Sequence, residues 1–435
     1  MESVSGLLWN YCDTLSLIKK RWNQKEEEDR MTVWKVFAVI GIFFATTIGW
    51  MILGVSIVQR TKNANDILTG EVSELWGSEH IQKAPYFVHY TMEKEKRTNE
   101  ETGKIYYIDV KRTHSYDAES SEIGVDFSLK YRRKGLIWFS TYKVFFDGKY
   151  VFKNDNIKPL NGFLVFEFPA SGAIYDNFKI LVDGKKFDTK EKMGTVVYVS
   201  VNLIPQEEKQ ITISYDSQGL NTWKYVFGDG IKQVKNFILT SNTNFDNPDF
   251  PKGTISPTEK EKTPDGWKFT WKYKDLVTGY SIGEEMPKRM NPGPLASRIS
   301  FFAPIPLLFF LTTILIFGSV RRIDLHPMHF FFLSASFFCF HLLYAYLVDH
   351  ITIHWTFLIS SIVVLLLVIP YLWLVVNARF AFLVAGFSEL IFLILFSYAF
   401  FFPGFTGLII TIGSIITLSI LMFSTAKVKW GEVFK

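Results

Sequence analysis

Residues 33–58 read VWKVFAVIGIFFATTIGWMILGVSIV, and Lys35 is the only charged side chain in this run. A helix needs about 20 apolar residues to cross the roughly 30 Å hydrocarbon core of a bilayer. The run therefore predicts a transmembrane helix. A cleaved signal peptide has a short basic start and a shorter apolar stretch, whereas residues 1–32 precede this long one. We expect an uncleaved signal anchor.

A second hydrophobic block begins after Ser300, where Phe, Leu, Ile and Val dominate and short connections divide the chain. These connections predict five further spans, at 301–320, 328–348, 352–376, 380–401 and 405–424. Between the two blocks the sequence is charged and punctuated by Gly and Asn. The pattern predicts a membrane α-helical bundle of about six transmembrane helices with one large inserted domain.

Basic residues in the short connections predict the orientation, because Lys and Arg accumulate on the cytoplasmic side of a membrane. They precede the first span, separate the second span from the third and the fourth from the fifth, and follow the last. These residues are Lys19, Lys20, Arg21, Lys25, Arg30, Arg321, Arg322, Arg379, Lys427, Lys429 and Lys435. The opposite connections, 349–351 and 402–404, contain neither Lys nor Arg. We predict that both termini are cytoplasmic and that the inserted domain is extracytoplasmic.

The domain organisation follows from these patterns. We predict a cytoplasmic N-terminal segment (1–32), the signal anchor (33–58), an extracytoplasmic β-rich domain (59–298), a C-terminal bundle of five helices (299–425) and a cytoplasmic tail (426–435). A break near residue 218 would divide the β-rich domain into two modules. Cys12 falls in the N-terminal segment and Cys339 in a predicted span, so we expect no disulfide in the outer domain.

The inserted domain shows the alternation that is typical of strands. Residues 267–274, WKFTWKYK, place aromatic and polar side chains at alternate positions, which buries one face of a strand and exposes the other. Similar alternation runs through 197–203 and 211–215. Asp147-Gly148 and Asp183-Gly184 lie between apolar runs, where they predict tight hairpin turns. We expect an all-β, sandwich-like domain.

Known catalytic signatures are absent from the sequence. There is no Gly-Lys-Ser/Thr phosphate loop, no His-Glu-x-x-His, no Gly-x-Ser-x-Gly and no Cys pair at zinc spacing. We therefore predict no catalytic, cofactor-binding or metal-binding residue and no enzyme activity. Both signs of charge are interspersed in the outer domain, so we also expect no nucleic-acid partner.

Two ionisable residues fall deep inside predicted spans, where a polar side chain is costly and needs a partner. His341 lies in the third span and Glu389 near the middle of the fifth. Their depths differ by roughly 6 Å at about 1.5 Å rise per residue, so they could form a hydrogen bond that fixes helix packing. A proton or solute pathway is the alternative interpretation.

The outer connection between the third and fourth spans also carries polar groups. Asp349, His350 and His354 could be imagined there as metal ligands, since a hairpin brings them together. No Cys or second carboxylate joins them, and polar side chains cost least at the boundary of a membrane. We therefore expect these residues to be boundary groups and not a metal site.

Short motifs in the C-terminal block match a known family in their order. They are Leu325-His326-Pro327 followed by Met328-His329-Phe330, Leu342-Leu343 leading into Asp349-His350, and the closing Lys427-Val428-Lys429-Trp430. This order resembles the CreD family of bacterial inner-membrane proteins, also called cell-envelope integrity proteins. Residues 241–271 are similar to that family's stretch before the second span.

The chain departs from the family pattern at Lys429, where Asp is usual before Trp430, and at 402–405, which lacks an acidic-Tyr start. The resemblance implies a role in envelope homeostasis beside a two-component sensor system, without an established catalytic residue. Our hypothesis is a non-enzymatic envelope protein, anchored in the lipid bilayer by its bundle, whose outer domain binds a protein, polymer or lipid. The alternative is a transporter or permease that uses Glu389 and His341. An intramembrane enzyme lacks an obvious nucleophile with a base.

Overall fold

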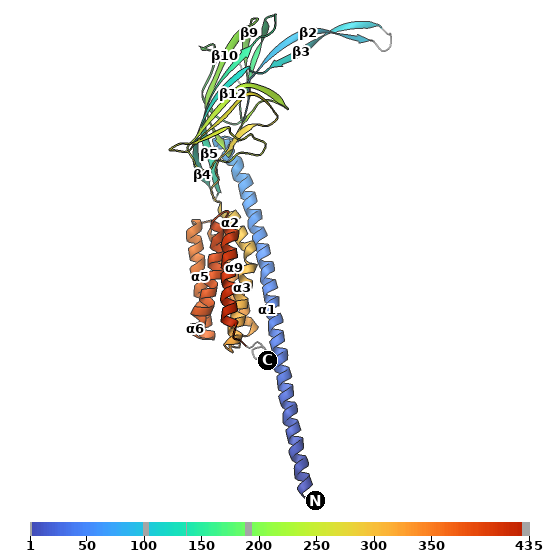
Figure 1. The fold of residues 1–435 in the computed structure, drawn as a ribbon, viewed down its shortest axis with the longest axis vertical. Coiled ribbons are helices and arrows are strands. Elements are labelled where there is room, and N and C mark those ends of the chain that lie inside the picture. The colour runs from blue at the N-terminus through green and yellow to red at the C-terminus, as the bar shows by residue number, and fades with distance from the viewer. Residues whose placement is uncertain (1, 99–103, 136, 188–193, 429–435) are drawn as a thin grey trace. The chain divides into compact units, whose positions relative to one another are not determined.

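The computed structural model describes residues 2–98, 104–135, 137–187 and 194–428, with side chains from Trp34 onward. The chain forms two compact units. The helical unit comprises Met1–Ala64 and Asn291–Lys435, and the β-rich unit comprises Asn65–Met290. Figure 1 shows the elements of each unit.

The helical elements follow the predicted spans to within a few residues at most ends. They are α1 (Glu2–Trp76), α2 (Pro292–Phe302), α3 (Pro304–Val320), α4 (Pro327–Leu347), α5 (Ile353–Val375), α6 (Ala378–Phe380), η1 (Ala381–Gly386), α7 (Phe387–Glu389), η2 (Leu390–Leu395), α8 (Phe396–Tyr398), η3 (Ala399–Phe401) and α9 (Thr406–Thr425). Among the described residues, five helices are long and apolar enough to cross a membrane. The count is six if α2 and α3, bent by 41° at their junction, form one span.

Helix α1 continues well past Val58, where the predicted span ended. Residues 59–76 contain no Pro, and residues such as Gln, Arg, Lys and Glu are compatible with a helix in water. The helix ends at Trp76 because Gly77 adopts a φ of +91°, a left-handed conformation that stops a helix. The apolar run marks only the part of the helix that suits lipid. It therefore predicted the end of the span at Val58 and not the end of the helix at Trp76.

The β-rich unit confirms the predicted large β-sheet domain. Its strands are β1 (His80–Lys83), β2 (Tyr86–Thr98), β3 (Ile105–Tyr116), β4 (Ser120–Lys134), β5 (Ile137–Lys153), β6 (Leu160–Glu167), β7 (Tyr175–Val182), β8 (Lys185–Lys186), β9 (Val196–Leu203), β10 (Glu208–Leu220), β11 (Thr222–Val226), β12 (Lys232–Thr243), β13 (Glu259–Lys262), β14 (Trp267–Thr278) and β15 (Ile282–Glu285). They form sheets of order β13-β14-β12-β4-β5-β10-β7-β8, β3-β2-β6-β9 and β1-β11-β15.

One hydrophobic cluster takes side chains from all three sheets. The three alternating stretches of the sequence lie in β14, β9 and β10, with their apolar residues in this cluster. Position 218, the predicted break, lies inside β10. Tyr215 before it and Trp223 after it belong to the same cluster, so the strands on both sides share one core.

The two predicted Asp-Gly turns have different outcomes. Asp183 and Gly184 connect β7 to β8 with φ values of +48° and +77°, as a tight hairpin requires. The prediction for Asp147-Gly148 was wrong, because both residues lie inside β5, between β4 and β10. A Cβ at Gly148 would lie 2.8 Å from the Tyr150 ring, so this glycine makes room for an aromatic side chain.

The last turns of α1 pack inside the β-rich unit. The guanidinium of Arg132 lies 3.2 Å from the centre of the Trp76 ring, and Lys134 Nζ lies 2.5 Å from a carboxylate oxygen of Glu71. Both basic residues stand at the end of β4. A stacked cation and an ion pair therefore hold the end of α1 to this strand.

Candidate functional site

Glu389 is the carboxylate that the helical unit buries most completely among the described residues, with 0% of its side chain exposed. It ends α7, a single turn of α-helix between the π-helical segments η1 and η2. π-Helical segments are rare and frequently occur at functional sites. The apolar sequence around Glu389 gave no signal for them.

The surroundings of Glu389 do not satisfy its charge. Neither carboxylate oxygen has a hydrogen-bond partner within the described part of the chain. An isolated carboxylate in an apolar interior costs several kcal/mol or more. The site therefore suits a carboxyl group that is either neutral or paired with a cation or a solute.

A cavity of about 170 Å³ lies beside this turn, between α3, the η1–η2 stretch and α9. Ser388, next to Glu389 in sequence, lines it together with Thr313 and Thr417. Arg321, at the end of α3, lines it as well. The cavity thus combines an apolar wall with three hydroxyl groups and one cation, and Glu389 itself does not line it.

His341 and Glu389 do not form the hydrogen bond that their sequence positions allowed. Its Nδ1 lies 2.9 Å from the carbonyl oxygen of Phe337, one turn earlier in α4, and its Nε2 has no partner among the described residues. The ring packs edge to face against Trp50 of α1, at a centroid distance of 5.4 Å. One ring that contacts His341 thus comes from the N-terminal helix, and the depth of His341 in its predicted span could not reveal this contact.

Further buried polar groups of the helical unit lack partners among the residues described. They are Trp50 Nε1, Ser334 Oγ, Tyr344 Oη, Thr356 Oγ1, Ser360 Oγ and Ser397 Oγ. Buried polar atoms are normally hydrogen-bonded to protein or to water, so each such group needs an explanation. In the sequence these residues are isolated positions within apolar spans, and no pattern connects them. The structure shows that all of them are buried in the helical unit.

The family-motif residues at the start of α4 have a structural role. His326 is the N-cap residue, and its Nδ1 accepts a hydrogen bond of 3.2 Å from the Met328 N–H. Pro327 occupies the first helical position, where a missing N–H costs nothing. Leu325 is buried, and the adjacent Asp324 pairs with Lys35 of α1 at 2.6 Å. The motif therefore starts a helix and lies next to a link to α1.

At the other end of α4, Asp349 lies 2.9 Å from the guanidinium of Arg60 on α1. His350 is exposed, and the ring of His354 packs against Phe401 at 5.2 Å. Among the described residues, no group of three side chains could hold a metal ion. Trp430, the remaining family-motif residue, lies outside the described residues.

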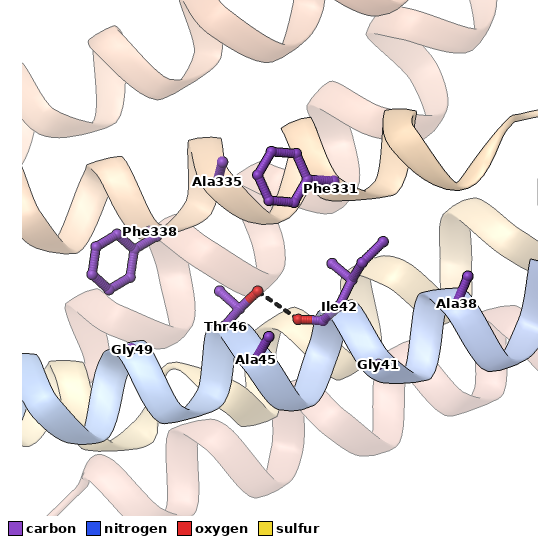
Figure 2. Close-up of a pocket in the computed structure, with 9 residues that line it drawn as sticks. All are labelled: Ala38, Gly41, Ile42, Ala45, Thr46, Gly49, Phe331, Ala335 and Phe338. Atoms are coloured by element: carbon purple, nitrogen blue, oxygen red, sulfur yellow. Dashed lines mark hydrogen bonds between the residues drawn. The ribbon is translucent and has the colours of Figure 1, made fainter.

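Figure 2 shows a groove of about 560 Å³ between α1 and α4. Gly41, Ala45 and Gly49 form its floor on α1, at the four-residue spacing of helices that approach closely in membranes. The hydroxyl of Thr46 donates to the Ile42 carbonyl oxygen at 2.7 Å, so it offers little to a ligand. The groove suits an apolar chain, and we assign it no specific function.

The β-rich unit contains a second unusual set of polar residues. On the three-stranded sheet, His80 of β1 is opposite Trp223 of β11, which is opposite Glu284 of β15. No more than 1% of any of these side chains is exposed. His80 Nδ1, Trp223 Nε1 and both Glu284 oxygens lack a hydrogen-bond partner in the described residues. We call these three residues the buried row.

Burial changes the ionisation of the two titratable residues of the buried row. It lowers the pKa of His80 to about 4, so the imidazole is neutral at pH 7. It raises the pKa of Glu284 to about 7, against the opposing effect of the neighbouring Ser241 hydroxyl. Glu284 therefore changes its charge near neutral pH inside the core. Sequence patterning missed this residue because it lies in a short strand of only four residues.

The fold and these sites define a membrane protein that combines several apolar helices with a large β-rich unit. Comparison with known families identifies it further. The chain belongs to the CreD family: the family model described as inner membrane protein CreD matches residues 31–431. This match confirms the resemblance found in the sequence and supports a location in the membrane.

Two solved structures show distant likenesses to the chain. A protein of Legionella pneumophila described as a candidate nutrient binding protein shares 13% identity, with a TM-score of 0.31, over 52% of this chain and 75% of its own. An M1 zinc metallopeptidase of Deinococcus radiodurans shares 9% identity, with a TM-score of 0.22, over 39% of this chain and 42% of its own. At such low scores neither likeness supports an argument about function. No curated protein matches the chain.

Proposed function

We propose that this protein is a non-enzymatic component of envelope homeostasis in the bacterial inner membrane. Its β-rich unit lies outside the cytoplasmic membrane, has a sandwich-like architecture and binds an envelope partner. Six spans hold it in the membrane with both termini in the cytoplasm. Membership of the CreD family and the basic residues of the connections support this assignment.

The observation that carries the proposal is how the chain enters and leaves the β-rich unit. Three residues separate the end of α1 from the first strand, β1, and six residues separate the last strand, β15, from the start of α2. Both strands pair with β11 in the three-stranded sheet. A change in this sheet on partner binding would therefore reach both chain connections to the helical unit, which suits a protein that relays a state.

The residues after β15 add to this coupling. The hydroxyl of Ser140 donates to the Pro287 carbonyl oxygen at 2.6 Å, and the guanidinium of Arg289 lies 4.3 Å from the centre of the Tyr131 ring. Both contacts lie within the β-rich unit. They tie the segment that leads to α2 to β4 and β5 of the large sheet.

The test uses cells that lack their own copy of the protein and a detergent or antibiotic challenge to the envelope. The full chain should restore tolerance. A chain in which a flexible linker replaces residues 77–290 should insert at normal abundance without restoring it. Restoration by the helical unit alone would contradict the proposal, and immunoblots of membrane fractions control for abundance.

A second function, transport of protons or a small cation, is favoured by one specific observation. Glu389 is fully buried, lacks a partner among the described residues and stands between two π-helical segments. Carboxylates in membrane helices commonly mark ion and proton pathways. Proton flux into vesicles that contain the purified protein, measured with an internal pH dye, would test it.

A further inference from the structure

A two-stranded arm extends from the β-rich unit. Strand β2 pairs with β6 only over Tyr86–His89, whereas its remaining residues pair with β3 alone. Figure 1 shows β2 and β3 projecting from the other strands of the unit. An isolated pair of strands buries little surface and is marginally stable by itself. The arm therefore adds little to the stability of the β-rich unit, and a function outside the core would explain its presence.

The two faces of the arm differ in how their charges are used. On one face, Arg112 lies 3.7 Å from Glu93 and 3.5 Å from Glu95, and Arg97 lies 3.4 Å from Glu95. The two acidic and two basic residues of this face neutralise one another. Exposed pairs of this kind contribute little energy, but they leave no net charge for a ligand. We call this the paired face.

The opposite face carries an excess of positive charge. Lys94, Lys96 and Lys111 are exposed there, with Asp109 as the one acidic residue among those described. None of the three lysines has an acidic side chain of the described residues within ion-pair distance, and Asp109, directly opposite Lys94, forms no ion pair with it. We call this the lysine face.

Exposed aromatic and apolar side chains lie between these lysines. Tyr107 is directly opposite Lys96 and is 65% exposed, and Met92, opposite Lys111, is 69% exposed. The ammonium group of Lys111 lies 3.7 Å from the centre of the Tyr90 ring. Residues two apart on a strand are spaced by about 6.7 Å on one face. The lysine face therefore presents cations and flat rings in a line.

This chemistry matches a polymer that carries both anions and ring-shaped units. Ammonium groups bind carboxylate, sulfate or phosphate, and tyrosine rings pack against the C–H faces of sugar rings. A membrane surface also attracts lysines and tyrosines. However, an anionic polysaccharide supplies both the anions and the ring-shaped units that this face fits, whereas a phosphatidylglycerol surface supplies anions without sugar rings.

We propose that the lysine face of the arm binds an anionic polysaccharide of the cell envelope. The proposal rests on the proposed function, because it names the class of partner for the β-rich unit. Lys94, Lys96 and Lys111 hold the anionic groups, and Tyr107 packs against the sugar rings.

Binding is tested with the full chain, purified in an uncharged detergent, by fluorescence anisotropy of labelled dextran sulfate. Uncharged dextran of the same length and inorganic polyphosphate are the comparison probes. The wild-type chain should bind dextran sulfate with an affinity that falls as salt rises, because counterions are released. Changing Lys94, Lys96 and Lys111 together to Gln should weaken binding by roughly tenfold or more. Changing the exposed Lys185, Lys186 and Lys252 to Gln removes the same charge elsewhere and should leave binding unchanged.

A second variant separates recognition of sugar from simple charge. Tyr107→Ala should weaken binding to dextran sulfate several-fold and leave binding to polyphosphate unchanged, since polyphosphate has no rings. All variants sit on exposed positions, and circular dichroism verifies that each keeps its fold.

Four results would overturn the proposal. The first is that the wild-type chain does not bind dextran sulfate, and the second is that both lysine variants lose the same amount of binding affinity. The third is that the chain binds anionic phosphatidylglycerol vesicles but not the polysaccharide. The fourth is that self-association through the free strand edges accounts for the anisotropy signal. These outcomes differ from failure of the proposed function. A β-rich unit found in the cytoplasm by labelling of intact cells would refute that function and leave the binding data standing.

Discussion

Replacement of Glu284 by Gln should make the β-rich unit more stable above neutral pH. The substitution keeps the shape of the protonated carboxyl and removes its ability to ionise. Glu284 is 1% exposed and neither oxygen has a partner in the described residues, so an ionised carboxylate there is opposed by desolvation. The variant protein removes that cost without creating a cavity.

The magnitude follows from the pKa of the carboxyl group. Burial raises the pKa of Glu284 from 4.5 to about 7, so the folded protein binds this proton more tightly than the unfolded chain. The contribution of Glu284 to the free energy of unfolding therefore falls as the pH rises from about 4.5 to about 7. At about 1.4 kcal/mol for each pH unit, this contribution falls by roughly 3 kcal/mol over the interval. Glu284→Gln should match the wild type near pH 4.5 and exceed it by roughly 3 kcal/mol above pH 7.5.

The assay is urea unfolding of residues 62–296, followed by circular dichroism at several pH values. This fragment should fold without oxidant and give a β-dominated spectrum, and a helical spectrum would refute the β-rich assignment. His80 also titrates, because burial lowers its pKa to about 4 and stability is lost as the pH falls from 6.5 to 4. Both proteins contain His80, so their difference reports Glu284 alone.

Glu259→Gln is the matched control, because Glu259 is exposed on β13 and should give a difference near zero at every pH. A constant difference between Glu284→Gln and the wild type from pH 4.5 to 8 would refute the reasoning. So would lower stability of the variant at high pH, since it would mean that the charged form has a stabilising partner.

Three further predictions follow from the fold. In a chain whose native cysteines are replaced by Ser, cysteines at Asn161 and Gly404 should react with an impermeant thiol reagent from outside intact cells and one at Ala426 should not; labelling at Ala426 would reverse the orientation. Gly148→Ala should destabilise the β-rich unit by about 1–3 kcal/mol, because its methyl group meets the Tyr150 ring; an unchanged melting temperature would contradict this packing. His341→Ala and Glu389→Ala should lower stability additively to within about 0.5 kcal/mol, because the two side chains share no hydrogen bond; recovery in the double variant would restore the pairing hypothesis, and full activity of Glu389→Gln in an envelope-stress assay would remove the main support for transport.

The sequence by itself was sufficient for the main division of this chain. Membrane helices need long apolar runs, so the spans could be located within a few residues for α4, α5 and α9. The strands β9, β10 and β14 were predicted because burial of one sheet face imposes a period of two. The resemblance to the family was also visible in the sequence, because it rests on short runs of adjacent residues such as Leu325-His326-Pro327. This motif starts a helix, which depends on local residues alone.

Tertiary structure decided the features that depend on contacts between distant residues. Gly148 looks like a turn residue in sequence, and only the Tyr150 ring and the flanking strands β4 and β10 show why it lies in a strand. The His341 ring packs against Trp50, nearly 300 residues earlier in the chain. The buried row joins His80 to Glu284 through β11, and no local pattern encodes such a pairing. Hydrophobic periodicity and the length of apolar runs indicate whether a segment faces lipid, water or the core. Which side chain packs against another is decided by the packing of the whole unit.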